Sequence, residues 1–187
     1  MRRGLAVAAL VTVLGGCGER PPMRLYVLGD SSWRPGAMRS ETGLAIIELR
    51  PVSIPDYLDT TDMFRWVGGN EVVPSPTGRW GERLSLGLTD ALASALARRL
   101  PDRVIATTSP VSQGRRVFVH MDTIHMDASG LCRVVASWRI TGEPGERRGS
   151  GNFAETATGL DDAAMAAVLT RVVGQLADQI AATIEGG

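Results

Sequence analysis

The sequence is short of cysteine, of net charge and of long apolar runs, and each shortage narrows the possible functions. Its 187 residues carry 20 basic and 20 acidic side chains, so no basic excess indicates a nucleic-acid partner. Every basic residue is arginine, and the only cysteines are Cys17 and Cys132. Beyond residue 14 no stretch approaches the 18 or so apolar residues of a membrane-spanning helix. The 44% hydrophobic and 21% charged content is that of an ordinary globular domain.

The first residues have the pattern of a secretory signal peptide. Arg2 and Arg3 precede the apolar run GLAVAALVTVL at residues 4–14, which is too short to cross a ~30 Å hydrocarbon core. The following Leu14-Gly15-Gly16-Cys17 resembles the lipobox of bacterial lipoproteins. That resemblance implies cleavage before Cys17, a diacylglycerol on its thiol and an acyl chain such as palmitate on its new amino group. A soluble secreted protein with a stray cysteine is the alternative.

We therefore predict a signal peptide at 1–16, a lipidated tether at 17–22 and a single domain at 23–187. Glycine rather than aspartate at position 18 favours the outer membrane, by resemblance to the lipoprotein sorting rule. A tether this short holds the domain within roughly 20–25 Å of the lipid, because an extended chain spans at most about 3.3–3.6 Å per residue. Once Cys17 is acylated, Cys132 has no partner within the chain.

Hydrophobic periodicity predicts an α+β fold. A stripe of leucines at every fourth position predicts a first helix over 79–100, and Asp161 is a good N-cap for a last helix. Alternating and buried-type runs predict strands at 23–28, 44–49, 63–67, 71–73, 104–107, 116–126, 131–141 and 150–156. The two helices are expected on one face of a mostly antiparallel or mixed sheet. Cys132 alternates in phase with Trp138, which indicates a small buried residue rather than a reactive thiol.

One set of residues resembles a serine esterase. Gly29-Asp30-Ser31 follows a strand, Gly69-Asn70 comes later, and Asp122 and His125 have the D-x-x-H spacing of GDS-type esterases. Strict alternation, however, puts residues three apart on opposite faces of a strand, and residues 43–77 show no crossover helix. By the same alternation His120 and His125 are expected on opposite faces, with no ligand cluster beside them. We therefore expect no catalytic residues, no metal site and no cofactor other than the lipid on Cys17.

The most informative stretch is IIELRPVSIPDYLD at residues 46–59, followed by RWGERL at 79–84. These segments, with the lipobox and a long hairpin ending in a tryptophan-containing strand, resemble the ABC-type transport auxiliary lipoprotein family (PqiC/YmbA-like). The matching positions of the first segment are Val52, Ile54, Pro55, Tyr57, Leu58 and Asp59, and those of the second are Trp80 and Leu84. The chain departs from the family where Thr60-Thr61-Asp62-Met63 replaces an arginine-containing run, and where Gly81 replaces alanine.

The resemblance implies a non-catalytic outer-membrane lipoprotein subunit of an MCE-type (PqiABC-like) lipid transport system. It would dock the periplasm-spanning MCE-domain protein at the outer membrane and support membrane integrity, with no cofactor besides the lipid on Cys17. The candidate partner-binding residues are Pro55, Tyr57, Leu58 and Arg65. Tyr57 and Leu58 can equally close the end of the core, and Trp80 is expected in the core. A homo-oligomer matching the conduit, a structural lipoprotein of another envelope complex, and a GDS-type esterase stay open as alternatives.

Overall fold

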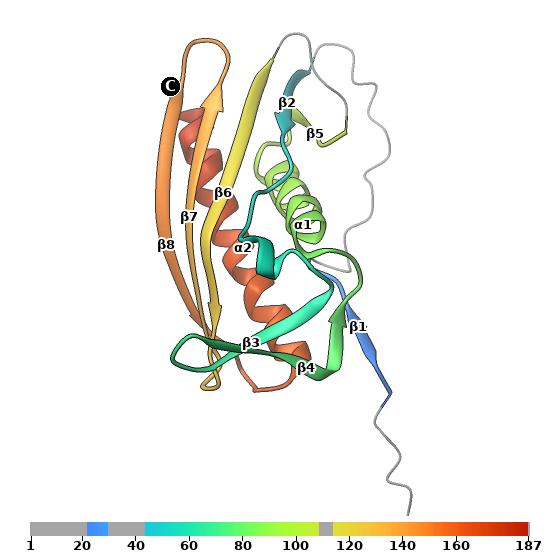
Figure 1. Cartoon of the computed structure of the whole chain (residues 1–187). Helices are drawn as coiled ribbons and strands as arrows, with labels where there is room; N and C mark the ends of the chain where they lie inside the picture. The colour runs from blue at the N-terminus through green and yellow to red at the C-terminus, as the bar shows by residue number, and fades with distance from the viewer. Residues whose placement is uncertain (1–21, 30–43, 109–113, 187) are drawn as a thin grey trace, which may run out of the picture.

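A computed structural model describes residues 22–29, 44–108 and 114–186 (Figure 1). Cys17, the signal peptide, nearly all of the tether, and Asp30 and Ser31 of the esterase-like set lie outside these residues. The fold is α+β, as predicted, with two helices and two mixed sheets. The strands of the larger sheet are β2 (Ala45–Leu49), β5 (Arg103–Ala106), β6 (Arg115–Met126), β7 (Leu131–Thr141) and β8 (Arg147–Thr156).

The larger sheet has the order β5-β2-β6-β7-β8. Its long antiparallel strands β6, β7 and β8 follow one another in the chain, while β2 runs parallel to both β5 and β6. After β2 the chain continues along β6: the Ser53 N–H donates to the Val119 carbonyl, and the Met121 N–H donates to the Ser53 carbonyl. The segment that resembles the family motif therefore leaves the sheet gradually, along its central strand.

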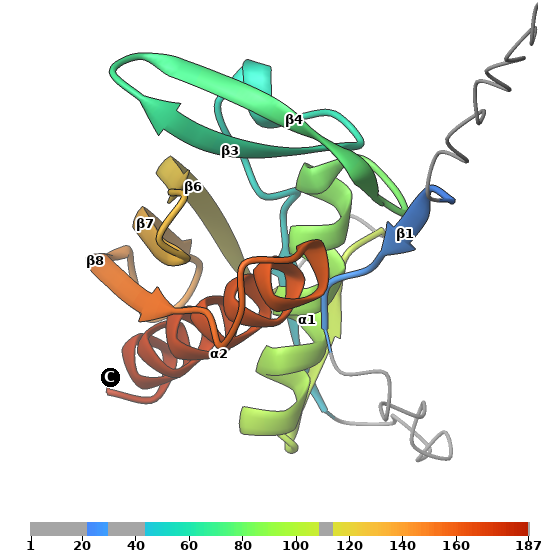
Figure 2. The same cartoon turned by 90° about the horizontal axis from the view of Figure 1, so that it is seen from below.

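A second, three-stranded sheet has the order β1-β4-β3. It consists of β1 (Arg24–Tyr26), β3 (Asp62–Gly68) and β4 (Glu71–Trp80), with a short 3-10 helix, η1 (Asp56–Leu58), before β3. The predicted hairpin at 63–73 is confirmed as β3 and β4, although β4 runs on to Trp80 and pairs in parallel with β1. Figure 2 shows this hairpin arching over the end of the larger sheet.

Both helices lie on one side of the larger sheet (Figure 2). They are α1 (Leu84–Arg99) and α2 (Asp162–Glu185). The predicted stripes of both helices are buried, and they pack against the inward side chains of β6 and β7. Trp80 is 5% exposed and Cys132 is fully buried, so both core assignments are confirmed. The inward residues of β7 are Cys132, Val134, Ala136, Trp138 and Ile140.

The start of the first helix was predicted too early. Arg79 and Trp80 are the last residues of β4, and α1 begins only at Leu84. The reason is the pairing with β1, which extends to Trp80 and continues as a hydrogen bond of 2.7 Å from the Gly81 N–H to the Tyr26 carbonyl. A leucine stripe that starts at Leu84 does not require helix before that residue.

The expectation that His120 and His125 lie on opposite faces is wrong. The register of β6 with β7 shifts between Met121 and Thr123, so Asp122 is an extra residue that resets the alternation. Before the shift, the buried residues of β6 are Val117, Val119 and Met121; after it, they are Ile124 and Met126. Both histidines therefore lie on the face of the sheet opposite the helices, where His125 stacks on Trp66 at a ring separation of 4.9 Å.

Candidate functional site

The segment 52–59 is held to the core by alternate apolar side chains. Val52, Ile54 and Leu58 are 2%, 8% and 5% exposed. The Val52 N–H also donates to the Thr89 hydroxyl of α1 at 2.9 Å. The turn itself is closed by the Leu58 N–H donating to the Pro55 carbonyl at 2.9 Å. Most of the apolar residues that carry the family resemblance are therefore structural.

Tyr57 is the exception among the apolar and aromatic residues of this segment. Its side chain is 46% exposed, although its neighbours fix its backbone on both sides. A rigid proline precedes η1, and buried Leu58 follows Tyr57 directly. An aromatic side chain on a fixed backbone loses little conformational entropy on binding, which is why tyrosine is enriched at interface hot spots. Tyr57 thus has the properties of a partner anchor.

Asp59 joins this turn to the first helix. The N-cap residue of α1 is Arg83, whose side chain makes no capping hydrogen bond. Instead, the Asp59 carboxylate accepts the Ser85 N–H at 3.3 Å and is also paired with the Arg83 guanidinium. Burial would raise the pKa of Asp59, but the hydrogen bonds from Ser85 and the nearby Arg83 outweigh this and lower it. Asp59 therefore caps α1 from a distant part of the sequence.

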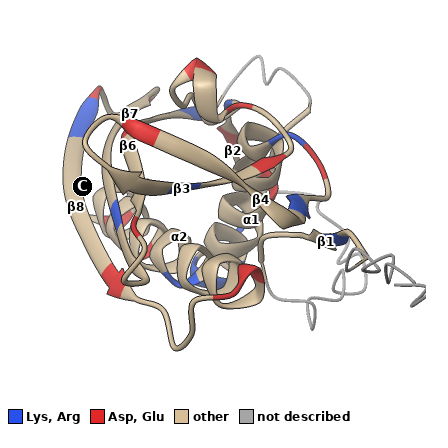
Figure 3. Ribbon diagram, turned by 60° about the horizontal axis from the view of Figure 1, so that its bottom comes forward, with Lys and Arg blue, Asp and Glu red and all other residues tan. Residues whose placement is uncertain are grey.

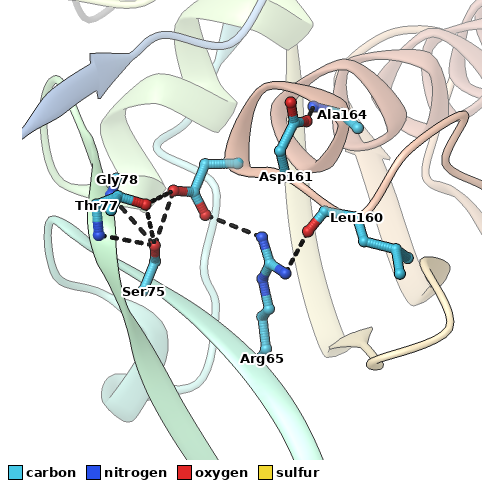
Figure 4. A network of polar contacts seen from close by, with 8 residues as sticks. Arg65, Ser75, Thr77, Gly78, Leu160, Asp161 and Ala164 are labelled. Atoms are coloured by element: carbon cyan, nitrogen blue, oxygen red, sulfur yellow. Dashed lines mark hydrogen bonds and ion pairs between the residues drawn. The ribbon is translucent and has the colours of Figure 1, made fainter. Parts of the chain in front are cut away.

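A second polar joint connects the three-stranded sheet to α2 (Figure 4). The Asp162 carboxylate, 5% exposed, accepts hydrogen bonds from the Ser75 and Thr77 hydroxyls, both at 2.8 Å. Arg65 on β3 donates to the other carboxylate oxygen at 3.0 Å and also to the Leu160 carbonyl. Burial raises the pKa of Asp162, but hydrogen bonds from Ser75, Thr77 and Arg65 more than compensate, so the pKa lies below its usual value.

The joint depends on the absence of a side chain at Gly78. A Cβ atom there would lie 2.5 Å from an Asp162 carboxylate oxygen, which is far inside van der Waals contact. The adjacent N-cap, Asp161, accepts the Ala164 N–H at 2.8 Å, so its predicted capping role is confirmed. A carboxylate held this tightly at a helix start is a structural group rather than a catalytic one.

The candidate partner-binding residues are thus in different environments. Tyr57 is exposed and Pro55 is half-buried at the same turn, whereas Leu58 belongs to the core. Arg65 lies on the other sheet and is engaged by Asp162 and Leu160. No observation tests binding at any of the four, and their role stays a prediction. Sequence reasoning did not identify the Asp162 joint, because it brings together residues 97 positions apart.

The esterase-like set shows no catalytic arrangement among its described members. His120 is paired with Asp122 at 3.4 Å, both on the exposed face of β6, and His125 stacks on Trp66. Within the described ranges, no three or more His, Cys, Asp or Glu side chains lie close enough together to hold a metal ion.

A hollow of about 740 Å³ lies on the face of the larger sheet opposite the helices. Phe118 and Trp138 are among the residues that line it, and the Arg139 guanidinium lies 4.6 Å from the centre of the Phe118 ring. Arg148, which also lines it, pairs with Glu146 at 2.6 Å. Figure 3 shows acidic and basic residues interspersed over the ribbon, and no single-sign surface emerges from them. The described helices include none long and apolar enough to cross a membrane.

A family model for the ABC-type transport auxiliary lipoprotein component matches residues 26–181. The chain belongs to this family. The match begins at the last residue of β1 and ends within α2, so it includes residues of both sheets and both helices. As an auxiliary component of an ABC-type transport system, the protein is expected to have partners in that system, and as a lipoprotein-family member it is expected at a membrane of the cell envelope.

Solved structures share this fold. An uncharacterised protein of known structure superposes with a TM-score of 0.70 at 19% identity, over 75% of this chain and 92% of its own. A protein from Xanthomonas campestris gives a TM-score of 0.63 at 13% identity, over 87% of this chain and 96% of its own. Identities this low support the fold alone. No curated protein matches the chain.

Proposed function

We propose that this protein is a non-catalytic outer-membrane lipoprotein that docks the MCE-domain protein of a lipid transport system. Cys17 would carry the lipid, and the domain would hold the far end of the periplasm-spanning conduit. The family match supports the auxiliary role. The observation that carries the docking role is the exposed ring of Tyr57 on a turn that buried Ile54 and Leu58 hold against the core.

The surroundings of Tyr57 suit an interface. The turn is connected to α1 through Asp59, whose carboxylate accepts the Ser85 N–H, and the next residue of α1, Leu86, is 49% exposed. Tyr57 and Leu86 thus lie close in sequence to the two ends of this hydrogen bond, and both side chains are exposed. Interface hot spots form where such anchors meet a partner pocket and exclude water.

The test is photo-crosslinking in cells. A photo-reactive amino acid replaces Tyr57 in the full-length protein, and the adducts are identified by mass spectrometry. The control carries the same amino acid at Leu160, which is 59% exposed on the loop before α2. The proposal predicts adducts with an MCE-domain protein from position 57 and none, or far fewer, from position 160.

Other outcomes would change the assignment. Adducts from position 57 only with other outer-membrane proteins would favour the second candidate, a structural lipoprotein of a different envelope complex. Equal adducts from both positions would remove Tyr57 as the docking residue. Hydrolase activity that disappears in the Ser31→Ala variant would contradict the non-catalytic role and favour the esterase alternative.

A further inference from the structure

Strand β1 and the residues on either side of it present a row of large apolar side chains to solvent. Met23, Leu25 and Val27 are 49%, 70% and 67% exposed. They alternate with Arg24 and Tyr26, so all three point to the same side of the strand. We call these three residues the β1 row. Three adjacent apolar side chains on one face of a strand are a contiguous surface rather than scattered exposure.

The β1 row cannot be buried in the core of the domain, because side chains on the opposite face of the strand already pack there. Tyr26 and Leu28 pack against the core. The pairing of β1 with β4 fixes Tyr26 beside Trp80, and the Tyr26 carbonyl accepts the Gly81 N–H at 2.7 Å. Slipping the register by one residue would bury the row but would expose Tyr26 and Leu28. The exposure of the row is therefore built into the fold.

Among the strands of the described residues, β1 pairs with β4 alone and therefore lies at the edge of its sheet. Natural edge strands commonly carry charged residues or proline, which discourage unwanted association. Here the two most exposed apolar side chains of the strand region, Leu25 and Val27, lie at that edge. An edge of this composition indicates an apolar surface that covers it.

The position of the row in the chain identifies that surface. Met23 follows Cys17 by six residues, so an extended chain places it within about 20 Å of the cysteine. Figures 1 and 2 show β1 at the periphery of the domain. If Cys17 is acylated, the part of the domain nearest to the membrane is the part that exposes Met23, Leu25 and Val27.

We propose that the β1 row is a membrane-contact surface, inserted into the interface of the lipid layer that holds the acyl chains of Cys17. This inference rests on the lipidation of Cys17 in the proposed function. Apolar side chains inserted at the headgroup boundary leave water, which favours this contact. The lipid anchor and the β1 row together fix the orientation of the domain on the membrane, which a tether alone would leave free.

The experiment uses the lipidated mature protein in vesicles of phosphatidylethanolamine and phosphatidylglycerol. A Leu25→Cys variant is labelled with an environment-sensitive fluorophore, and quenching by nitroxide-bearing lipids is measured. Labelling is specific because Cys132 is fully buried and burial raises the pKa of its thiol to about 11. The matched control is Val67→Cys, a 51% exposed apolar position at the far end of β3.

The proposal predicts several-fold stronger quenching at position 25 than at position 67, with blue-shifted emission only at position 25. A Leu25→Asp change should abolish the quenching of a label introduced by Val27→Cys. Equal, weak quenching at positions 25 and 67 would overturn the proposal, as would blue-shifted emission at position 25 without lipid quenching, since a second copy of the chain would then cover the row.

The mass of the purified protein keeps this test separate from the proposed function. A mature chain without acyl groups would overturn both the anchor and the membrane-contact surface. A lipidated chain with a water-exposed label at position 25 would overturn the membrane contact alone. Quenching at position 25 together with absent crosslinks from Tyr57 would contradict the docking role and support the membrane contact.

Discussion

The Asp59 carboxylate accepts the backbone N–H of Ser85 at 3.3 Å, although the two residues are 26 positions apart. Helices usually obtain such a cap from the residue just before their first turn. Here the preceding residue is Arg83, and the cap comes from the end of η1. The turn that presents Tyr57 and the first turn of α1 are consequently one structural unit.

Because Asp59 caps α1, we expect Asp59→Ala to destabilise the domain. The loss of a capping carboxylate costs about 0.5–2 kcal/mol in free energy of unfolding. Asp56→Ala is the control, because Asp56 is exposed in the same 3-10 helix and makes no cap to α1. Urea denaturation measures both variants. Equal unfolding free energies for the two variants would contradict the role of Asp59 as the cap.

Neighbouring residues of η1 should respond differently to truncation. Leu58→Ala removes a buried side chain and should cost about 2–5 kcal/mol of stability. Tyr57→Ala removes a half-exposed ring, and we expect a change within about 0.5–1 kcal/mol together with loss of partner capture. The measurements are thermal unfolding and pull-down from cell envelopes. A large loss of stability in Tyr57→Ala would assign that ring to the core.

Two glycine-to-alanine substitutions should change the free energy of unfolding in opposite directions. Gly78→Ala puts a Cβ atom 2.5 Å from the Asp162 carboxylate and should destabilise by about 1–3 kcal/mol. Gly174→Ala, in the middle of α2, meets nothing closer than Arg99 Nη2 at 3.7 Å. Because alanine favours helix, we expect it to stabilise by up to about 1 kcal/mol. Destabilisation by both changes would count against the specific clash at Gly78.

The interactions of the Asp162 carboxylate should make the free energy of unfolding depend on pH. Its folded-state pKa is below the ordinary value of 3.8, so the unfolded chain takes up the proton first as pH falls. The stabilisation is therefore complete above about pH 5 and is lost as pH falls through the folded-state pKa. Asp162→Asn should flatten this loss relative to wild type, whereas Asp90→Asn, on the exposed face of α1, should not. Unfolding free energies between pH 7 and pH 3 are the test.

Cys132 should be unreactive until the domain unfolds. It is fully buried, and desolvation raises the pKa of its thiol to about 11. Because the thiolate is the nucleophile, a maleimide should leave Cys132 of the folded wild-type protein unmodified at neutral pH and label it fully in urea. Rapid labelling of the native protein, compared with a Cys132→Ala blank, would show that β7 opens locally.

Much of the fold follows from the hydrophobic periodicity of the sequence and from residues that begin or end helices and strands. The strand at 131–141 was predicted at its observed bounds, and Asp161 was identified as the N-cap of α2. The start of α1 was missed because Trp80 and Arg79 suit a helix start as well as a strand end. Only the parallel pairing of Tyr26 with Trp80 decides between them, and that contact depends on tertiary structure.

The face of β6 on which His120 and His125 lie could not be predicted, for a related reason. A bulge at Asp122 leaves the composition of β6 unchanged but reverses the alternation after Met121. The candidate site was predicted in part: the segment 54–59 is a turn that presents Tyr57, but the burial of Leu58 and the contacts of Arg65 depend on elements far away in the chain. Local patterns contain no information on those partners.

The last helix of the domain has a consequence for biogenesis. α2 supplies a large share of the core and also binds the earliest strand region, where the Gly29 N–H donates to the Thr170 hydroxyl at 3.3 Å. A chain delivered from its N-terminus therefore cannot complete its core until its final residues have emerged. During that interval the β6-β7-β8 hairpins can form, but their apolar face has no cover. That face becomes covered only when α2 folds onto it.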